Sequence, residues 1–543
     1  MSGRRIASAA ALIAVLTVLA RIAGFGRTMV FAWAVGDNDL GDIYLAANTV
    51  PNIIYEIVAG GALASLVVPL LAGAVAAGDR DAVSRTTSTL LTWTLALLVP
   101  LALVVAVAAE PIVGALADHP AQVDTGARML QVFAPQLPLY GIGIVLTGVL
   151  QAHRRFAWPV LAPLLSSVTV ATAYVTFVAV DQRGADLAGL STAGLLVLAG
   201  GTTLGVVVLA GCLVPAVARL GIRVRLGWRF EADARRRVGG LAAAGAVTVA
   251  SQNLALLVVM GQGLAGPEGS WVLFTLAQTI FLLPWAVLAV PVATAAYPRL
   301  AEAAATDRAD RYQQTLAQTT RAVVLLSLLG AAALIALAVP IATLLAIVMP
   351  SASLAAVDRL AGGIAWFAPG LLGYGLFAVL SRALYARGET RAAALAAVGG
   401  WAVVAGGAVA LAAGLPDSAR VPALTAANAV GMSVLGGALL LAVSRTAGRA
   451  ALAGVVRTGL VALLAAGLAA GAGWLVADWS MPAGHPPAIA AVVGSGMLAG
   501  VTVGAVFGGV GWALDRRDVR PMVAALAGRL AAVRRSGRPN QSS

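Results

Sequence analysis

Residues 69–86 read PLLAGAVAAGDRDAVSRT, and residues 298–315 read PRLAEAAATDRADRYQQT, a copy of the same pattern 229 residues later. In both copies a proline and an apolar helix end lead into a charged turn and then a long apolar stretch. A second pair, LQAHRRFAWP at 150–159 and LYARGETRAA at 384–393, is offset by 234 residues. The sequence therefore predicts a repeat in which six membrane spans correspond to the next six. Because six is even, both copies share one orientation, as in transporters with parallel repeats.

The composition indicates a membrane protein. Of the 543 residues, 60% are apolar and 11% are charged, whereas soluble domains have about 45–50% and 25%. A membrane span needs about 20 mostly apolar residues, and fourteen apolar stretches of the sequence are candidates for such spans. We therefore predict an all-α polytopic membrane protein of about 14 transmembrane helices, with two parallel six-helix lobes plus two C-terminal helices. The predicted spans are 8–36, 44–77, 86–109, 127–150, 159–180, 187–217, 238–263, 270–298, 319–347, 360–384, 391–413, 421–443, 457–477 and 488–513.

Charged turns divide the chain into five segments. We predict an N-lobe at 1–218, a cytoplasmic arginine-rich linker at 219–237 and a C-lobe at 238–444. The last two spans occupy 445–514, and 515–543 form a basic cytoplasmic tail, which reads as an amphipathic helix on anionic lipid. The apolar run after the charged start continues past Gly36 without a small-residue cleavage site, so we expect the first helix to be retained.

The basic residues give the orientation. All 36 are arginines; thirty lie in one set of alternate loops and termini and four in the other set. Positive charge marks the cytoplasmic side, so we expect a multi-pass membrane protein with both termini in the cytoplasm. The formal charge of +13 therefore belongs to loops, and we expect no nucleic-acid partner. The remaining two arginines, Arg21 and Arg27, fall inside the first span.

The sequence argues against catalysis. A single Cys212 excludes a disulfide framework, and three scattered histidines exclude most metal chemistry. Without lysine the chain cannot carry a phosphate-binding loop of the G-x-x-x-x-G-K-[ST] type. We expect no enzyme activity and no cofactor.

Arg21 and Arg27 are candidates for substrate binding. A charge inside a span costs about 2.5–3.5 kcal/mol, so it is functional by default. Six residues correspond to about 600° of helical turn, which points the two side chains about 120° apart in a straight helix. Gly24 and Gly26 between them allow a bend. Two converging guanidiniums would bind a diphosphate; the alternative is that they snorkel or pair with acidic residues of the second span. Arg21, nearer mid-span, is the stronger candidate.

The second span carries a polar stripe. Asn48, Asn52 and Glu56 follow at i, i+4 and i+8, flanked by Pro51 and the glycine pair at 60–61. Such a stripe lines a cavity or a buried helix contact, and Glu56 favours the cavity. Glu56 either pairs with an arginine of the first span or binds a coupling ion. Gln252, Asn253, Gln278 and Asn428 are weaker candidates, for which hydrogen bonding between helices is the favoured role.

These segments resemble the MurJ/MviN family of proposed lipid II flippases, in the MOP exporter superfamily. The resemblance is clearest in ARIAGFGRTMVFAWAVG at 20–36 and GDIYLAANTVPNIIYEIVAGGALASLVVPLL at 41–71, and continues at 150–163, 281–305 and 384–394. The second of these segments looks like the actinobacterial branch.

The resemblance implies a V-shaped bundle of two lobes around a cationic cavity, with the last two helices forming a groove for a polyprenyl tail. It implies lipid II, the undecaprenyl-diphosphate-linked disaccharide-pentapeptide, as substrate, moved to the outer leaflet. Arg21 and Arg27 match the family's diphosphate-binding arginines, and Asp42 matches its acidic residue at the start of helix two. We further expect contacts with membrane lipids and with cell-wall synthesis and division proteins.

Two positions depart from the family pattern. Tyr55 and Glu56 stand where many members have an arginine pair, and Thr279, preceded by Gln278, stands where they have an arginine in helix eight. The cavity would be less cationic than usual. Two alternatives therefore stay open: another exporter of the superfamily, for a different lipid-linked glycan or a drug, and a scaffold that recruits cell-wall enzymes without transporting.

Overall fold

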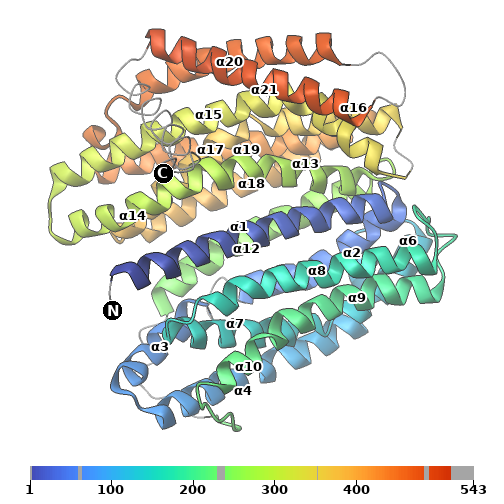
Figure 1. Ribbon diagram of the computed structural model, residues 1–543, viewed down its shortest axis with the longest axis vertical. Coiled ribbons are helices and arrows are strands. Elements are labelled where there is room, and N and C mark those ends of the chain that lie inside the picture. The colour runs from blue at the N-terminus through green and yellow to red at the C-terminus, as the bar shows by residue number, and fades with distance from the viewer. Residues whose placement is uncertain (1–2, 59–63, 229–238, 351–352, 482–487, 515–543) are drawn as a thin grey trace, which may run out of the picture. The chain divides into compact units, whose positions relative to one another are not determined.

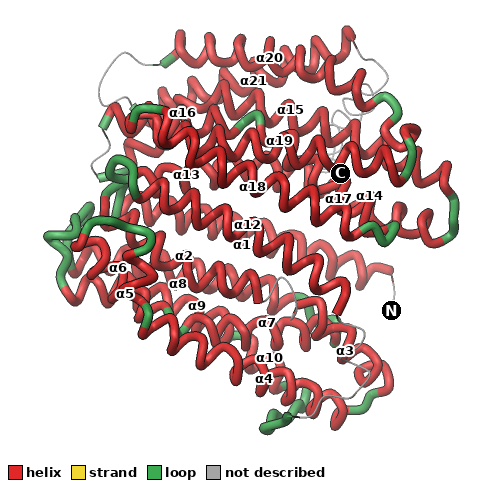
Figure 2. The backbone as a smooth tube through the Cα atoms, turned by 180° about the vertical axis from the view of Figure 1, so that it is seen from behind, coloured by secondary structure: helices red, strands yellow, loops and turns green. Residues whose placement is uncertain are grey.

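The computed structural model describes residues 3–58, 64–228, 239–350, 353–481 and 488–514. Figure 2 shows these residues as helices joined by short loops, and the described part of the chain contains no strand. The all-α prediction is confirmed. The glycine pair at 60–61, residues 229–237 of the predicted linker, His485 and the basic tail at 515–543 lie outside the described residues.

The helices follow the predicted spans closely. Within the described ranges, twelve stretches are long and apolar enough to cross a membrane, and the bent pair of α16 (Leu354–Phe367) and α17 (Gly370–Ala386) makes a thirteenth. The remaining predicted span, 44–77, falls on α2 (Asp39–Val58) and α3 (Ala64–Ala77), which stand on either side of undescribed residues. The protein is a multi-pass membrane protein.

The chain divides into two compact units. The first unit comprises residues 1–276, 345–356 and 408–424, and the second comprises 277–344, 357–407 and 425–543. The first unit therefore contains the predicted N-lobe, the first predicted span of the C-lobe at 238–263, and the ends of several later helices. Its complete helices, labelled in Figures 1 and 2, are α1 (Gly3–Ala34), α2, α3, α4 (Arg80–Val107), α5 (Ala109–Gly114), α6 (Pro120–Phe133), α7 (Gln136–Ala152), α8 (Ala157–Val180), α9 (Thr192–Gly211), α10 (Leu213–Ala218) and α12 (Gly239–Leu264).

A buried aromatic cluster fixes α1 against α2 and α8. The ring of Tyr44 stacks on Phe31 at 5.4 Å between centroids and meets Phe133 and Tyr174 edge-on. The Tyr44 hydroxyl lies 2.9 Å from that of Tyr174 and also contacts Thr202 on α9. Because buried hydroxyls need partners, these rings and hydroxyls hold α1, α2, α6, α8 and α9 in one register. Arg27 lies one helical turn before Phe31 on α1.

A second core joins α3, α4, α7 and α10. Val67, Leu90, Val145 and Leu213 are among its fully or nearly fully buried members. The helix α4 begins after Asp79, whose carboxylate accepts a hydrogen bond of 2.8 Å from Ala82 N. This is the usual N-cap arrangement, and it satisfies an amide that the helix leaves unpaired.

The second unit contains all of α17 and most of α13 (Ser270–Pro284), α15 (Ala309–Val348), α16, α18 (Thr390–Gly414) and α19 (Arg420–Thr446).

A close helix contact and a bent helix mark this unit. A Cβ at Gly373 would lie 1.9 Å from Met432 O, so only glycine permits this approach of α17 to α19. Pro284 and Pro291 flank a π-helical turn at Trp285–Ala289, a common device for bending a helix. The unit also contains α14 (Val290–Ala305), α20 (Val455–Ser480) and α21 (Ile489–Leu514).

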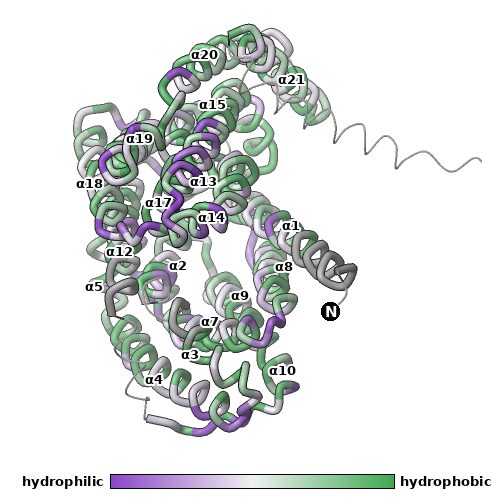
Figure 3. The backbone as a smooth tube through the Cα atoms, turned by 90° about the vertical axis from the view of Figure 1, so that its left-hand side faces the viewer, coloured by the Kyte–Doolittle hydropathy of each residue, from purple (hydrophilic) through white to green (hydrophobic). Residues whose placement is uncertain are grey.

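Large aliphatic side chains point outward from several helices. Leu463 and Leu464 on α20 are about 60% exposed, as are Leu103 and Val104 on α4. Figure 3 shows α4, α20 and α21 as predominantly hydrophobic along their lengths. Such surfaces are expected where helices face lipid.

Candidate functional site

The two arginines of the first span lie on one uninterrupted helix. α1 continues through Gly24 and Gly26, so the glycines do not break the helix. A Cβ at either position would meet nothing within 4 Å. Arg21 is exposed, and Arg27 is half-buried. The charge of Arg27 interacts with the hydroxyls of Tyr140 on α7 and Tyr174 on α8. Arg27, rather than Arg21, is therefore within electrostatic range of polar side chains on neighbouring helices.

Asn52, in the middle of the polar stripe of α2, contacts α7. The Tyr140 hydroxyl donates a hydrogen bond of 2.8 Å to Asn52 Oδ1, while Asn52 Nδ2 donates to Asn48 O at 2.8 Å. The ring of Tyr55 packs on that of Tyr140, with centroids 4.5 Å apart. The Oδ1 atom of Asn48 is buried without a hydrogen-bond partner among the described residues. An unpaired buried acceptor is costly, so a ligand donor or a water molecule would be stabilised there.

Glu56 pairs with an amide and not with an arginine. Asn253 Nδ2 on α12 donates to Glu56 Oε2 at 3.2 Å and to Val249 O at 2.9 Å. Glu56 forms no ion pair with any residue the structure describes, and its side chain is exposed. The helix-to-helix role expected of Asn253 is confirmed. Of the two roles left open for Glu56, pairing with Arg21 or Arg27 is not found among the described residues, and ion binding stays a prediction.

Asp42 lies in a different environment. It is 2% exposed, and its Oδ1 accepts a hydrogen bond of 2.8 Å from Val272 N in the first turn of α13. The first four amides of a helix lack partners within the helix, so Asp42 caps α13 from another helix. This residue therefore ties α2 to α13 and is not open to a ligand in this conformation.

Further contacts surround Asp42 at the helix ends that the charge pattern places outside the membrane. Asn38 Nδ2 donates to Val35 O and Ala185 O, and Asn38 Oδ1 accepts from Gly41 N. Arg183 donates from Nε to Trp33 O at 2.9 Å and from a terminal nitrogen to Val348 O, with its guanidinium 5.4 Å from the Trp33 ring centre. We call Asn38, Asp42, Arg183, Asp417 and Arg420 the outer-end cluster.

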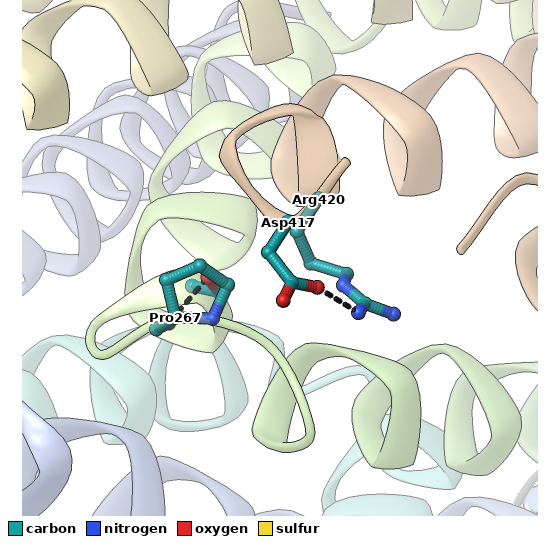
Figure 4. Close-up of polar contacts among 4 residues, drawn as sticks. Pro267, Asp417 and Arg420 are labelled. Carbon is teal, nitrogen blue, oxygen red and sulfur yellow. Dashed lines mark hydrogen bonds and ion pairs between the residues drawn. The ribbon is translucent and has the colours of Figure 1, made fainter. Parts of the chain in front are cut away.

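Figure 4 shows the remaining part of this cluster. The guanidinium of Arg420 is paired with Asp417, and Pro267 lies close by in the turn between α12 and α13. A Cβ at Gly266 would lie 2.6 Å from Arg420 Cγ, so the arginine stem packs directly on this turn. Helix ends from five separate parts of the sequence thus meet within the first unit. The sequence singled out only Asp42 among these residues.

The other predicted candidates are more dispersed. Gln252 is half-buried on α12 beside Asn253, and Gln278 is half-buried on α13 within the second unit. Tyr140 is a site residue that the sequence reasoning missed. Its signal was present, because Gln136 and Tyr140 are polar side chains within an apolar span that also contains Pro135 and Pro138.

Comparison with known proteins gives the family. Residues 31–490 match the family model described as lipid II flippase MurJ. The chain belongs to this family. MurJ of Burkholderia cenocepacia is 25% identical over 390 residues, covering 70% of this chain and 74% of the relative. The probable MurJ of Haemophilus influenzae is 26% identical over 400 residues, covering 69% and 75%. The family resemblance seen in the sequence is confirmed.

Solved structures agree on the fold. A MurJ structure in an inward closed conformation matches with a TM-score of 0.71 at 17% identity, covering 91% of this chain and 98% of that one. An inward-facing multidrug transporter of the MATE family, in the MOP superfamily, matches with a TM-score of 0.63 at 16% identity, covering 79% and 94%. The MurJ fold therefore extends over nearly the whole chain.

Proposed function

We propose that this chain is a transporter that moves lipid II from the inner to the outer leaflet of the bacterial plasma membrane by alternating access. Membership of the lipid II flippase family over residues 31–490 carries this proposal. The arrangement of α1, α2 and α7 supports it, because a cation and several hydrogen-bonding groups gather where the sequence predicts a membrane interior.

Arg27 and Arg21 are the proposed diphosphate ligands. A guanidinium presents a planar set of donors that matches phosphate oxygens. Arg27 is half-buried beside Tyr140, which bonds Asn52, and the free acceptor of Asn48 is on the same stripe of α2. In this proposal the arginines hold the diphosphate, while Asn48, Asn52 and Gln252 supply hydrogen bonds to sugar or peptide groups. Glu56 completes the polar lining in this unit, and Asp42 acts on the conformation. A substrate contact of Gln278, which belongs to the second unit, stays a prediction.

The outer-end cluster supports alternating access. Its contacts, with the packing of Arg420 on Gly266, join the ends of α1, α2, α15 and α19 to α13 or its preceding turn and to the loop at Arg183, on the side that the arginine distribution predicts to be outside. Contacts of this kind stabilise a state that is closed on the outer side, and they must break to release a substrate there. The cytoplasmic location of both termini belongs to the same proposal.

An apolar groove in the second unit suits a hydrocarbon chain. It has a volume of about 430 Å³ and is lined by Ile335 and Val339 of α15, Ala361 of α16, and Ala470 and Trp474 of α20. We propose that this groove, next to the last two spans, contacts the polyprenyl tail of lipid II.

The proposal is tested in proteoliposomes that contain fluorescent lipid II. The double variant Arg21→Ala/Arg27→Ala should lower translocation by at least tenfold, since each hydrogen bond to a charged group contributes about 1.5–3 kcal/mol. The matched control is Arg445→Ala/Arg449→Ala, which removes two exposed arginines elsewhere.

Wild-type rates in the double variant, at equal incorporation, would refute the role of these arginines. Wild-type protein that fails to move lipid II but moves another polyprenyl-linked glycan would favour the broader exporter alternative. Cell-wall enzymes as protein partners remain a prediction, to be tested by co-purification.

A further inference from the structure

A non-helical segment crosses the surface of α4 at the end of the N-lobe. Residues 221–228, which we call the strap, leave the short helix α10 and run along α4. The backbone amides of Arg223, Arg225 and Gly227 donate to the hydroxyls of Ser84, Ser88 and Thr92 at 3.2, 3.0 and 3.1 Å.

The spacing explains this match. Two residues of extended chain advance about 6.6 Å, and four residues of helix advance about 6 Å. Alternate strap amides therefore meet successive turns of α4. A Cβ at Gly227 would lie 2.9 Å from Thr89 Oγ1, so a larger residue would displace the strap or the Thr89 side chain. The final contact is Trp93 Nε1 donating to Trp228 O, with the two indole rings edge-to-face at 5.6 Å.

Because side chains of an extended segment alternate, the strap separates two environments. On one side is an apolar groove of about 750 Å³, where Ile222, Val224 and Leu226 face residues of α4, α7 and α10. On the other is a polar pocket of about 850 Å³ lined by Arg80, Arg85, Arg223 and Arg225. Leu226 and Trp228 border both. Figure 3 shows hydrophilic stretches at the corresponding ends of α4 and α10.

The described lining of the polar pocket has more positive than negative charge. Its four arginines form no ion pair with any described residue, and Asp81 is the single carboxylate in the lining. The positive-inside pattern places α4's first turn and the strap on the cytoplasmic side, and a tryptophan pair is typical of a membrane interface. The site therefore combines an excess of positive charge, an adjoining apolar groove and an interfacial position.

We propose that the strap and α4 form a binding site for an anionic phospholipid of the inner leaflet. The phosphate group is held by Arg223, Arg225, Arg80 and Arg85, and an acyl chain occupies the apolar groove. A soluble anion would use the arginines alone, and a neutral lipid would use the groove alone; the observed pairing of the two selects an anionic lipid. This site is separate from the diphosphate ligands proposed on α1.

The test is native mass spectrometry of the full-length protein titrated with dioleoyl phosphatidylglycerol or dioleoyl phosphatidylcholine. We expect preferential retention of phosphatidylglycerol. The variant Arg223→Ala/Arg225→Ala should weaken this binding by roughly 25-fold, about fivefold for each arginine, and Arg80→Ala/Arg85→Ala should do the same. The control Arg445→Ala/Arg449→Ala should have no effect.

A groove variant distinguishes a lipid from a free anion. Ala96 is exposed and lines the apolar groove, so Ala96→Trp fills it without touching an arginine. We expect this change to lower phosphatidylglycerol binding as well. Equal binding of the two lipids, or full binding after loss of either arginine pair, would overturn the proposal. If the protein binds inorganic phosphate and Ala96→Trp does not lower phosphatidylglycerol binding, the arginines form an anion site that does not use the groove. That result would also overturn the proposal.

The outcome is independent of flipping. The variant Arg21→Ala/Arg27→Ala should keep phosphatidylglycerol bound at the strap even where lipid II translocation is lost, so failure of one proposal is distinguishable from failure of the other.

Discussion

Removal of the Asp42 carboxylate should open the outer side of the transporter. In the structure Asp42 is buried, and its Oδ1 accepts the Val272 amide at 2.8 Å. Asp42→Ala leaves that amide unpaired in the closed state, whereas water can reach it once the helix ends separate. A hydrogen bond to a charged group contributes about 1.5–3 kcal/mol, so the ratio of closed to open protein should fall by about 10- to 150-fold.

Site-directed labelling measures this shift. In a Cys212→Ser background, Asn48→Cys places a thiol six residues beyond Asp42, about 9 Å along α2. The reaction of this thiol with a membrane-impermeant maleimide, added outside intact cells, reports the open population. We expect labelling at least tenfold faster with Asp42→Ala. Asp42→Asn retains an oxygen acceptor and should show a smaller increase.

A carboxylate on the same side provides the control. Asp124 is exposed and pairs with Arg128 at 2.9 Å outside the cluster, so Asp124→Ala should leave the labelling rate unchanged. If Asp42→Ala labels at the wild-type rate while its melting temperature and expression are normal, the contact does not hold the outer side closed, and the reasoning is refuted.

Three further predictions follow from single contacts. Glu56→Gln keeps an acceptor for Asn253. If the membrane potential drives transport, at about 2.3 kcal/mol per charge per 100 mV, this variant should translocate lipid II at a rate within about threefold of wild type. A loss of more than tenfold in proteoliposomes would indicate an ion coupled at Glu56. Arg183→Lys cannot reach Trp33 O and Val348 O together and loses about 1 kcal/mol, so maleimide labelling at position 48 should rise about fivefold, and an unchanged rate would count against this contact. Gly227→Ala should lift the strap, because overpacking costs about 1–3 kcal/mol; faster hydrogen exchange over 221–228 is expected, and protection equal to wild type would contradict the close approach to Thr89.

The helices could be predicted from the sequence because apolar runs in this chain are long and end at charged turns. The predicted spans at 86–109 and 159–180 correspond to α4 at Arg80–Val107 and α8 at Ala157–Val180. Charges and amides inside such runs also stand out, which is why Arg27, Asn52 and Asn253 were identifiable before the structure was known.

The remaining contacts depend on how distant helix ends meet. Nothing in the local pattern pairs Asp42 with Val272 or Arg183 with Val348, because these partners are separated by more than 160 positions. For Glu56 the sequence left two roles open, pairing with an arginine of the first span or binding an ion, and it did not predict that packing of α12 against α2 brings Asn253 to it. The position of the strap could not be predicted from a periodic pattern in residues 221–228, because its backbone amides bond to hydroxyl groups on another helix, α4.

The measurement that tests the central claim most directly is depletion of this protein in its host, with lipid-linked intermediates quantified by mass spectrometry. If the chain is the lipid II flippase of that cell, lipid II accumulates in the inner leaflet before lysis, and a wild-type copy reverses this while Arg21→Ala/Arg27→Ala does not. Unchanged lipid II levels after complete depletion would contradict the account.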